Sequence, residues 1–215
     1  MLADQEVRIL EERIRVLETR TGVQVVISVI DRADRYHGLR WRALALGDSL
    51  ASLGVMAWDR LRERPTSPDD VLLVVAVILA VGLAAALAAT LLPPFARLFL
   101  EPGRALAEVR ARAESQFLSR ELFRTRTRSA VLLLASRFER EAVVYVDVGL
   151  RERLARERMN EITTPMRPHL RSGRIAQALL VGLDALEALL VSAGCSGGGT
   201  GVNELPDRPV CGESV

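Results

Sequence analysis

The chain has 215 residues, which is enough for one domain with membrane segments or for two small domains at most. Hydrophobic residues make up 49% of the sequence and aromatic residues only 4%, so the apolar content is mainly Leu, Val and Ala. There is no Lys, which excludes Schiff-base and P-loop lysine chemistry, and a net charge of +2 with Arg alternating with Glu argues against a nucleic-acid-binding protein.

The first 30 residues predict a helix followed by a strand. Apolar side chains recur at helical spacing at Val7, Leu10, Ile14 and Leu17. Residues 23–30, VQVVISVI, are rich in β-branched side chains on both faces, as in a strand that is covered on two sides. One helix cannot bury such a strand, so its partners must come from later in the chain.

Residues 71–92, VLLVVAVILAVGLAAALAATLL, form the longest run without a charge. A helix of that length spans about 33 Å at about 1.5 Å per residue, which is enough to cross the hydrocarbon core of a bilayer. Ser67 to Asp70 provide capping groups before it, and Pro93-Pro94 end it. Small residues recur at every fourth position, where another helix could approach closely: Ala76, Ala80, Ala84 and Ala88. This segment is predicted to be a transmembrane helix.

Residues 43–58, ALALGDSLASLGVMAW, are the candidate for a second span. The run is shorter and contains Asp48, which costs about 2.5–3.5 kcal/mol near the centre of a span. Trp41 and Trp58 lie where an interfacial belt would place them. We expect a hairpin with spans at about 41–59 and 71–92; the alternative for the first segment is an amphipathic helix in the membrane plane. One carboxylate in so small a hairpin does not indicate ion transport.

A hairpin places both flanks on one side of the membrane. Arginines near the spans on the flank side outnumber those in the connection, which contains Arg60, Arg62 and Arg64. The positive-inside rule therefore places the flanks in the cytoplasm. The charged N-terminus is unlike a signal peptide. The expected location is the cell inner (cytoplasmic) membrane, as a multi-pass protein.

The segments after the hairpin complete a domain. Residues 102–122 predict an amphipathic helix, 129–136 and 141–148 predict two strands joined by a short turn, and helical patterns follow at 150–158, 165–170 and 175–192. The fold class is α/β, a small β-sheet flanked by helices and interrupted by a transmembrane helical hairpin. The expected division is 1–40 and 94–193 for the two parts of the domain, 41–93 for the hairpin and 194–215 for a flexible Gly-rich tail.

The order of these elements resembles the TPM domain family. The resemblance rests on the strand pair SAVLLLASRFEREAVVYVDVGL, the ending PMRPHLRSGRIAQALLVGLDALEALL, and the Gly-rich tail closing in NELPDRPV. In particular, the chain is similar to bacterial membrane-bound members with transmembrane helices within or beside the domain. Where the family often has Asn-Gly before the second strand, this chain has Arg128-Ser129; of the Gly-rich turn after the third strand, Gly149 and Leu150 remain.

The resemblance implies a layered sheet with helices on both faces and leaves two functions open. The first is a non-enzymatic interaction or accessory module at the bacterial cytoplasmic membrane, with the lipid bilayer and an unidentified membrane or cytoplasmic protein as partners. The alternative is a membrane-bound, metal-dependent enzyme like the acid phosphatases among its relatives. Homo-oligomers through the transmembrane Ala and Gly faces are a further expectation. No nucleic acid is expected, and no cofactor other than a divalent cation such as calcium.

Acidic side chains at predicted strand ends are the candidate metal ligands. Asp31, Asp34 and His37 follow the first strand, and Asp147 ends the third. The alternative for this first group is a solvated linker into the membrane helix. Arg124, Arg126 and Arg128 would point the same way in an extended segment and could hold an anion. The alternative is a polar loop, and His169 is interpreted as a structural surface residue.

Overall fold

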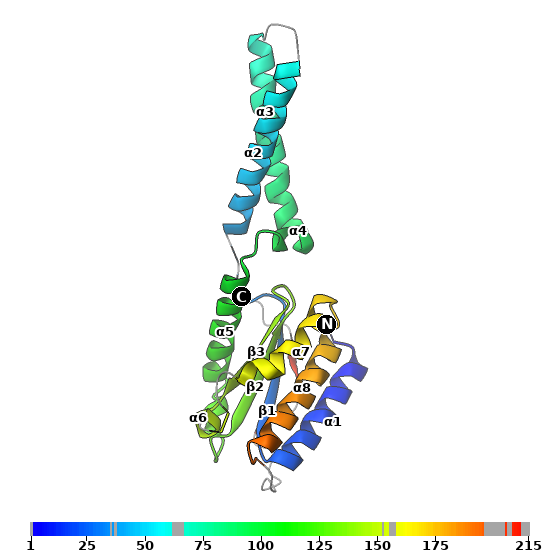
Figure 1. Ribbon diagram of the computed structural model, residues 1–215, viewed down its shortest axis with the longest axis vertical. Helices are drawn as coiled ribbons and strands as arrows, with labels where there is room; N and C mark the ends of the chain where they lie inside the picture. Colours follow the sequence, from blue (N-terminus) through cyan, green and yellow to red (C-terminus); the bar gives the residue numbers. More distant parts are fainter. Residues whose placement is uncertain are drawn as a thin grey trace. The chain divides into compact units, whose positions relative to one another are not determined.

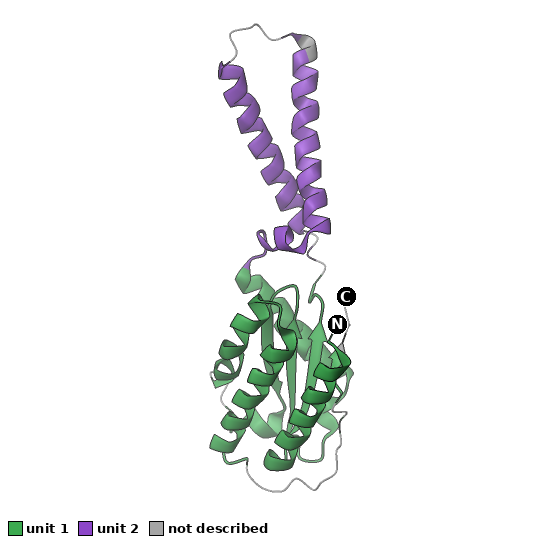
Figure 2. Cartoon of the chain, turned by 90° about the vertical axis from the view of Figure 1, so that its right-hand side faces the viewer, with its two compact units in different colours: residues 1–34, 102–215 green, residues 35–101 purple. Residues whose placement is uncertain are grey.

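The computed structural model describes residues 2–34, 36, 38–61, 67–151, 153–154, 158–195, 205 and 208–211 (Figure 1). The chain divides into two compact units, which Figure 2 distinguishes by colour. Unit 1 combines residues 1–34 with 102–215, and unit 2 comprises residues 35–101. Unit 2 begins and ends several residues outside the 41–93 segment expected from the sequence. Its first helix already begins at Gly38, and the short helix α4 (Pro93–Arg97) belongs with the hairpin.

Unit 1 is built on a four-stranded sheet with the order β3-β2-β1-β4. Strand β1 (Gln24–Ile30) pairs in parallel with β2 (Ala130–Ser136), and β3 (Glu141–Val146) pairs antiparallel with β2 after a tight turn. The register joins Gln24 to Ala130 and Ile30 to Ser136, so residues 106 positions apart in the sequence form a continuous ladder. The predicted α/β fold with an interrupted domain is confirmed.

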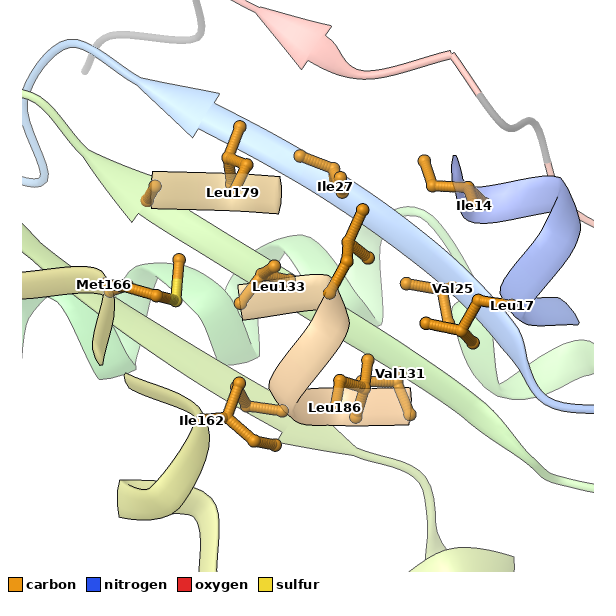
Figure 3. Packing of buried hydrophobic residues seen from close by; sticks show 14 of the residues in the cluster. Ile14, Leu17, Val25, Ile27, Val131, Leu133, Ile162, Met166, Leu179 and Leu186 are labelled. Atoms are coloured by element: carbon orange, nitrogen blue, oxygen red, sulfur yellow. The ribbon is translucent and has the colours of Figure 1, made fainter. Parts of the chain in front are cut away.

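One face of the sheet is covered by three helices, α1 (Asp4–Thr21), α7 (Met159–Arg171) and α8 (Ile175–Ser192). Figure 3 shows side chains from each of these helices meeting those of β1 and β2: Ile14 and Leu17, Ile162 and Met166, and Leu179 and Leu186 over Val25, Ile27, Val131 and Leu133. All of them are buried, and each such side chain contributes about 1.5–3 kcal/mol by leaving water. This cluster is the main core of unit 1.

The other face of the sheet packs against α5 (Pro102–Ser119). Val109, Ala113 and Phe117 of this helix contact strand residues that point away from the first core, including Val26 and Leu132. Alternate residues of β1 and β2 thus enter two different cores, which explains why both faces of the VQVVISVI segment are apolar.

Two predicted elements differ from the structure after β3. The expected helix 150–158 is reduced to the short α6 (Val148–Arg151), and α7 begins at Met159; residues 155–157 lie outside the described part of the chain. The segment from 194 onwards was expected to be a flexible tail. Instead, Val210–Cys211 form β4, which pairs in parallel with Ser28 and Val29 of β1. The backbone of these two residues is therefore hydrogen-bonded to β1 at the edge of the sheet instead of being exposed to solvent.

Unit 2 is a pair of packed helices, α2 (Gly38–Leu61) and α3 (Pro68–Leu91), followed by α4. The start of α3 is fixed by a capping box, in which the Ser67 hydroxyl accepts a hydrogen bond from the Asp70 amide and the Asp70 carboxylate accepts one from the Ser67 amide. The helices approach closely at two glycines, since a Cβ on Gly47 would lie 2.9 Å from the Gly82 Cα. Ala76, Ala80 and Ala84 are exposed and lie outside this contact.

Candidate functional site

The two ends of the sheet carry different polar groups. We call the end formed by residues 31–34 and 136–141 the junction edge, because the chain leaves unit 1 there after β1. We call the other end, formed by residues 121–129 and 147–151, the far edge. The two edges are separated by the seven residues of β1, which at about 3.3 Å each is about 20 Å.

At the junction edge the carboxylates are engaged by the domain itself. Glu139 is 8% exposed; its carboxylate accepts hydrogen bonds from the Ala33 amide, at 3.0 Å, and from the Ser136 hydroxyl. An Arg137 nitrogen lies 3.8 Å from Asp31, and an Arg104 nitrogen lies 4.0 Å from Asp34. These contacts join the end of β1 to the β2-β3 turn and to the start of α5.

At the far edge lies a buried carboxylate, Asp147, which is 2% exposed. One of its oxygens accepts a hydrogen bond of 2.7 Å from the Val148 amide, and the other has no hydrogen-bond partner among the described residues. Nearby, Gly149 lies against the loop before β2: its amide donates to the Arg128 carbonyl at 3.0 Å, and a Cβ there would come within 2.6 Å of that oxygen. Close packing against this loop therefore explains why position 149 is a glycine.

The predicted metal ligands do not meet in one place. Asp31 and Asp34 lie at the junction edge, whereas Asp147 lies at the far edge, because β3 runs antiparallel to β1 and its end returns to the start of the sheet. His37 lies outside the described residues. Among those that are described, no group of three or more His, Cys, Asp or Glu side chains is placed to hold a metal. His169 is half-buried on α7, with its Nδ1 atom buried and lacking a hydrogen bond within the described structure.

The arginine segment before β2 is folded rather than extended. Residues Leu122–Arg124 form a 3₁₀ turn, and the Arg128 amide donates to the Thr125 carbonyl. Arg124 forms an ion pair with Glu121 at 2.6 Å, and the Arg128 guanidinium lies 5.4 Å from the centre of the Phe123 ring. The three arginines therefore do not form the row that an extended segment would give, but all three remain exposed.

Sequence reasoning missed the side chains that complete the far edge. Arg151 of α6 lies 5.9 Å from the Tyr145 ring centre and donates a hydrogen bond of 3.3 Å to the Tyr145 hydroxyl. Sequence patterns likewise do not identify Glu139 and Arg104 as site residues, since isolated charges in a turn or on a helix resemble ordinary solvated residues. The i,i+6 separation of Tyr145 and Arg151 across a strand end carries no recognisable periodic signal.

In unit 2, the acidic side chain of Asp48 lies between α2 and α3. The Oδ1 atom of Asp48 is buried and has no hydrogen-bond partner among the described residues. A Cβ built on Gly82 would lie 1.8 Å from that oxygen, so the absence of a side chain at Gly82 makes room for the carboxyl group.

Unit 1 is a layered α/β domain with different polar groups at the two ends of its sheet, and a helical hairpin is inserted into it after β1. The chain is therefore an α/β-domain protein with a helical insertion. Residues 105–189, from α5 to α8, match the family model of the TPM domain. The resemblance to the TPM domain family that the sequence predicts is confirmed for these residues.

The chain is also similar to a solved structure, the NMR structure of the BA42 protein from the psychrophilic bacterium Bizionia argentinensis. The similarity covers 99% of this chain and 96% of that one, with a TM-score of 0.56 and 13% sequence identity. At that identity the likeness shows a shared fold. No curated protein matches the chain.

Proposed function

We propose that this chain is an integral membrane protein whose TPM domain serves as a non-enzymatic interaction or accessory module on the cytoplasmic side of a bacterial inner membrane. The observation that carries the proposal is α3. Residues Asp70–Leu91 are long and apolar enough to cross a membrane, and only 6% of the most apolar window is buried by the rest of the chain. Most of its large apolar side chains are exposed within the described part of the chain, as expected for a helix that is surrounded by lipid.

The second helix that is long and apolar enough, α8, has a different role. Half of its window is buried, and its residues form the main core of unit 1. This is the property of a core helix in a folded domain, so of these two helices α3 is the one that we assign as the primary span.

The companion span in this proposal is α2. Its exposed side chains are largely apolar, with Trp41 near one end and Trp58 near the other. It packs against α3 through Gly47, so the cost of Asp48 is reduced by placing the carboxyl group at Gly82 rather than in lipid. Two spans also return the chain to the side it left, which β1 requires in order to pair with β2.

Orientation follows from the arginines. Arg40, Arg42 and Arg97 flank the ends of the spans that are connected to unit 1, and the positive-inside rule favours the cytoplasm for that side. Phe95 and Phe99 are both half-buried, and their ring contact, at 5.4 Å between ring centres, suits an interfacial position for α4.

A non-enzymatic role is favoured over a metal-dependent phosphatase by the placement of the acidic residues. A phosphatase of that kind needs a metal or nucleophile together with groups that hold the phosphate. The structure separates Asp147 from Asp31 and Asp34 by the length of β1, and arginines pair with the latter two.

Two experiments test the proposal. Reporter fusions at both termini and within residues 62–66 should place the termini in the cytoplasm and the connection outside; termini on opposite sides would contradict the hairpin. Purified full-length protein should not hydrolyse p-nitrophenyl phosphate with or without Ca²⁺ or Mg²⁺. Metal-dependent turnover that is abolished by Asp147→Asn, but not by Glu12→Gln at an exposed ion pair, would establish the phosphatase instead.

A further inference from the structure

The far edge of the sheet presents a group of exposed guanidinium groups. We define the arginine surface as Arg126, Arg128 and Arg151. The first two come from the loop before β2, and the third comes from α6 after β3. The Gly149 amide hydrogen-bonds to the Arg128 carbonyl, so the two segments are in direct contact.

Two of these side chains are held in place by aromatic rings. The Arg128 guanidinium lies over Phe123 at 5.4 Å, and that of Arg151 lies over Tyr145 at 5.9 Å with an additional hydrogen bond to the tyrosine hydroxyl. Both rings pack against the core between the sheet and α5, where the ring centre of Tyr145 lies 4.8 Å from that of the buried Phe117. The aromatic support restricts side chains that are mobile on most surfaces, and so lowers the entropy lost when they bind an anion.

The backbone beneath the arginine surface is also constrained. Arg128 has φ of 51° and Glu121 has φ of 52°, a left-handed conformation that is uncommon for residues other than Gly. The loop between them is fixed by the Thr125 hydroxyl, which accepts from the Ser129 amide at 3.2 Å. Within the described residues, no carboxylate forms an ion pair with Arg128 or Arg151, in contrast to Arg124, Arg104 and Arg137.

The arginine surface lies away from the points where the chain leaves and re-enters unit 1. The chain enters and leaves unit 1 at the junction edge, whereas the arginine surface lies at the other end of β1, about 20 Å away. Guanidinium groups bind carboxylates in pairs of parallel hydrogen bonds, which suits Asp and Glu side chains of an exposed protein segment. The occupant that matches this chemistry is a segment of another protein that is rich in Asp and Glu.

We propose that the arginine surface is the docking site for an acidic, extended segment of a partner protein. This inference rests on the proposed interaction role of the domain and names the chemistry of its partner. Arg128 and Arg151 bind carboxylates of that segment, while Phe123 and Tyr145 hold the two guanidinium groups in position.

The test uses full-length protein in lipid nanodiscs and a fluorescein-labelled peptide of twelve residues rich in Asp and Glu, with binding followed by anisotropy. Arg128→Gln with Arg151→Gln should weaken binding about tenfold or more, because two charge-assisted contacts are lost. Arg8→Gln with Arg171→Gln removes the same charge from exposed sites on α1 and α7, and should change the affinity less than about twofold.

Equal weakening by both double variants, or absence of binding by the unmodified protein, would overturn the proposal. Binding that is transferred equally well to a twelve-nucleotide RNA, or to vesicles containing phosphatidylglycerol, and that is lost in the same Arg128/Arg151 variant, would also overturn it. Turnover of p-nitrophenyl phosphate by the same preparation would contradict the non-enzymatic role while leaving the peptide result intact, so the two failures are distinguishable.

Discussion

Glu187 of α8 shows how one buried charge ties two helices together. It is 8% exposed; its carboxylate accepts hydrogen bonds from Arg13 and, at 2.6 Å, from Arg20, both on α1. The hydrogen bond from Arg13 lowers the pKa of Glu187 below its ordinary value of 4.5, against the opposing effect of burial. The carboxylate form is therefore favoured in the folded state.

We predict that Glu187→Gln reduces the free energy of unfolding at pH 7 by about 2 kcal/mol, because a charge-assisted network is replaced by neutral contacts. Since the folded-state pKa is depressed, this stabilisation is present above pH 4.5 and is lost as the pH falls through the folded-state value. Thermal unfolding at pH 7 and at pH 3.5 should thus show a difference between variant and parent that shrinks with acid. Glu12→Gln, at an exposed pair with Arg15, should change stability by less than about 0.5 kcal/mol. An undiminished difference at low pH would contradict this.

Gly149 supports the far edge through the absence of a side chain. Gly149→Ala should destabilise unit 1 by about 1–3 kcal/mol, because its Cβ would lie 2.6 Å from the Arg128 carbonyl oxygen and 2.8 Å from that of Thr127. Backbone atoms cannot move aside as a flexible side chain can. The matched control is Gly103→Ala in α5, where no atom lies within 4 Å of the new Cβ and a neutral or slightly stabilising effect is expected. Equal melting temperatures for the two variants would show that the loop can shift to accommodate the new Cβ, and would contradict the prediction.

At the scale of elements, β4 is the part of the sheet that sequence patterns did not reveal. Strand β1 would be an edge strand without it, and an exposed apolar edge is prone to pairing with other chains. Val210 opposes Ser28 and Cys211 opposes Val29, while the Leu205 amide donates to the Gln24 side chain at 3.1 Å. The C-terminal segment therefore covers both ends of β1.

Removing residues 205–215 should leave the fold intact but make β1 amides exchange at least tenfold faster with deuterium, since the pairing with β4 is lost. Self-association of the detergent-solubilised protein should rise in parallel. Removing only residues 212–215, which lie beyond β4, should change neither quantity. Unaltered exchange in the longer truncation would mean that β4 contributes nothing to protection of β1.

Helices and strands that have several residues of regular hydrophobic spacing could be predicted from the sequence. Very short strands, and contacts that depend on the direction in which a strand runs, could not. The bounds of α8 at 175–192 followed from its apolar spacing, and β1 and β2 from β-branched runs. By contrast, β4 has two residues and no periodicity, and Tyr145 with Arg151 becomes a unit only through folding. The short turn before β3 forces that strand to run antiparallel to β2, which places Asp147 at the opposite end of the sheet from Asp31. Grouping the two residues because each follows a strand ignores this difference in strand direction.

At the scale of the whole molecule, unit 2 is an insertion into a domain that is complete without it. The insertion leaves after β1 and returns at α5, and the two points are adjacent in unit 1, with a nitrogen of Arg104 4.0 Å from an Asp34 oxygen. Both cores and all described strands belong to unit 1, and the main core contains residues from before and after the insertion.

Replacing residues 35–101 by a linker of about six Gly and Ser residues, which can span up to about 20 Å, should therefore yield a water-soluble domain. The variant should unfold cooperatively and retain the parallel β1-β2 pairing, visible as slowly exchanging amides in both strands. A matched variant with the same deletion and Leu132→Asp should not fold, because it places a charge in the second core. Insoluble or non-cooperative protein from the simple deletion would mean that the helical hairpin is needed to bring β1 to β2, and that the two units fold as one.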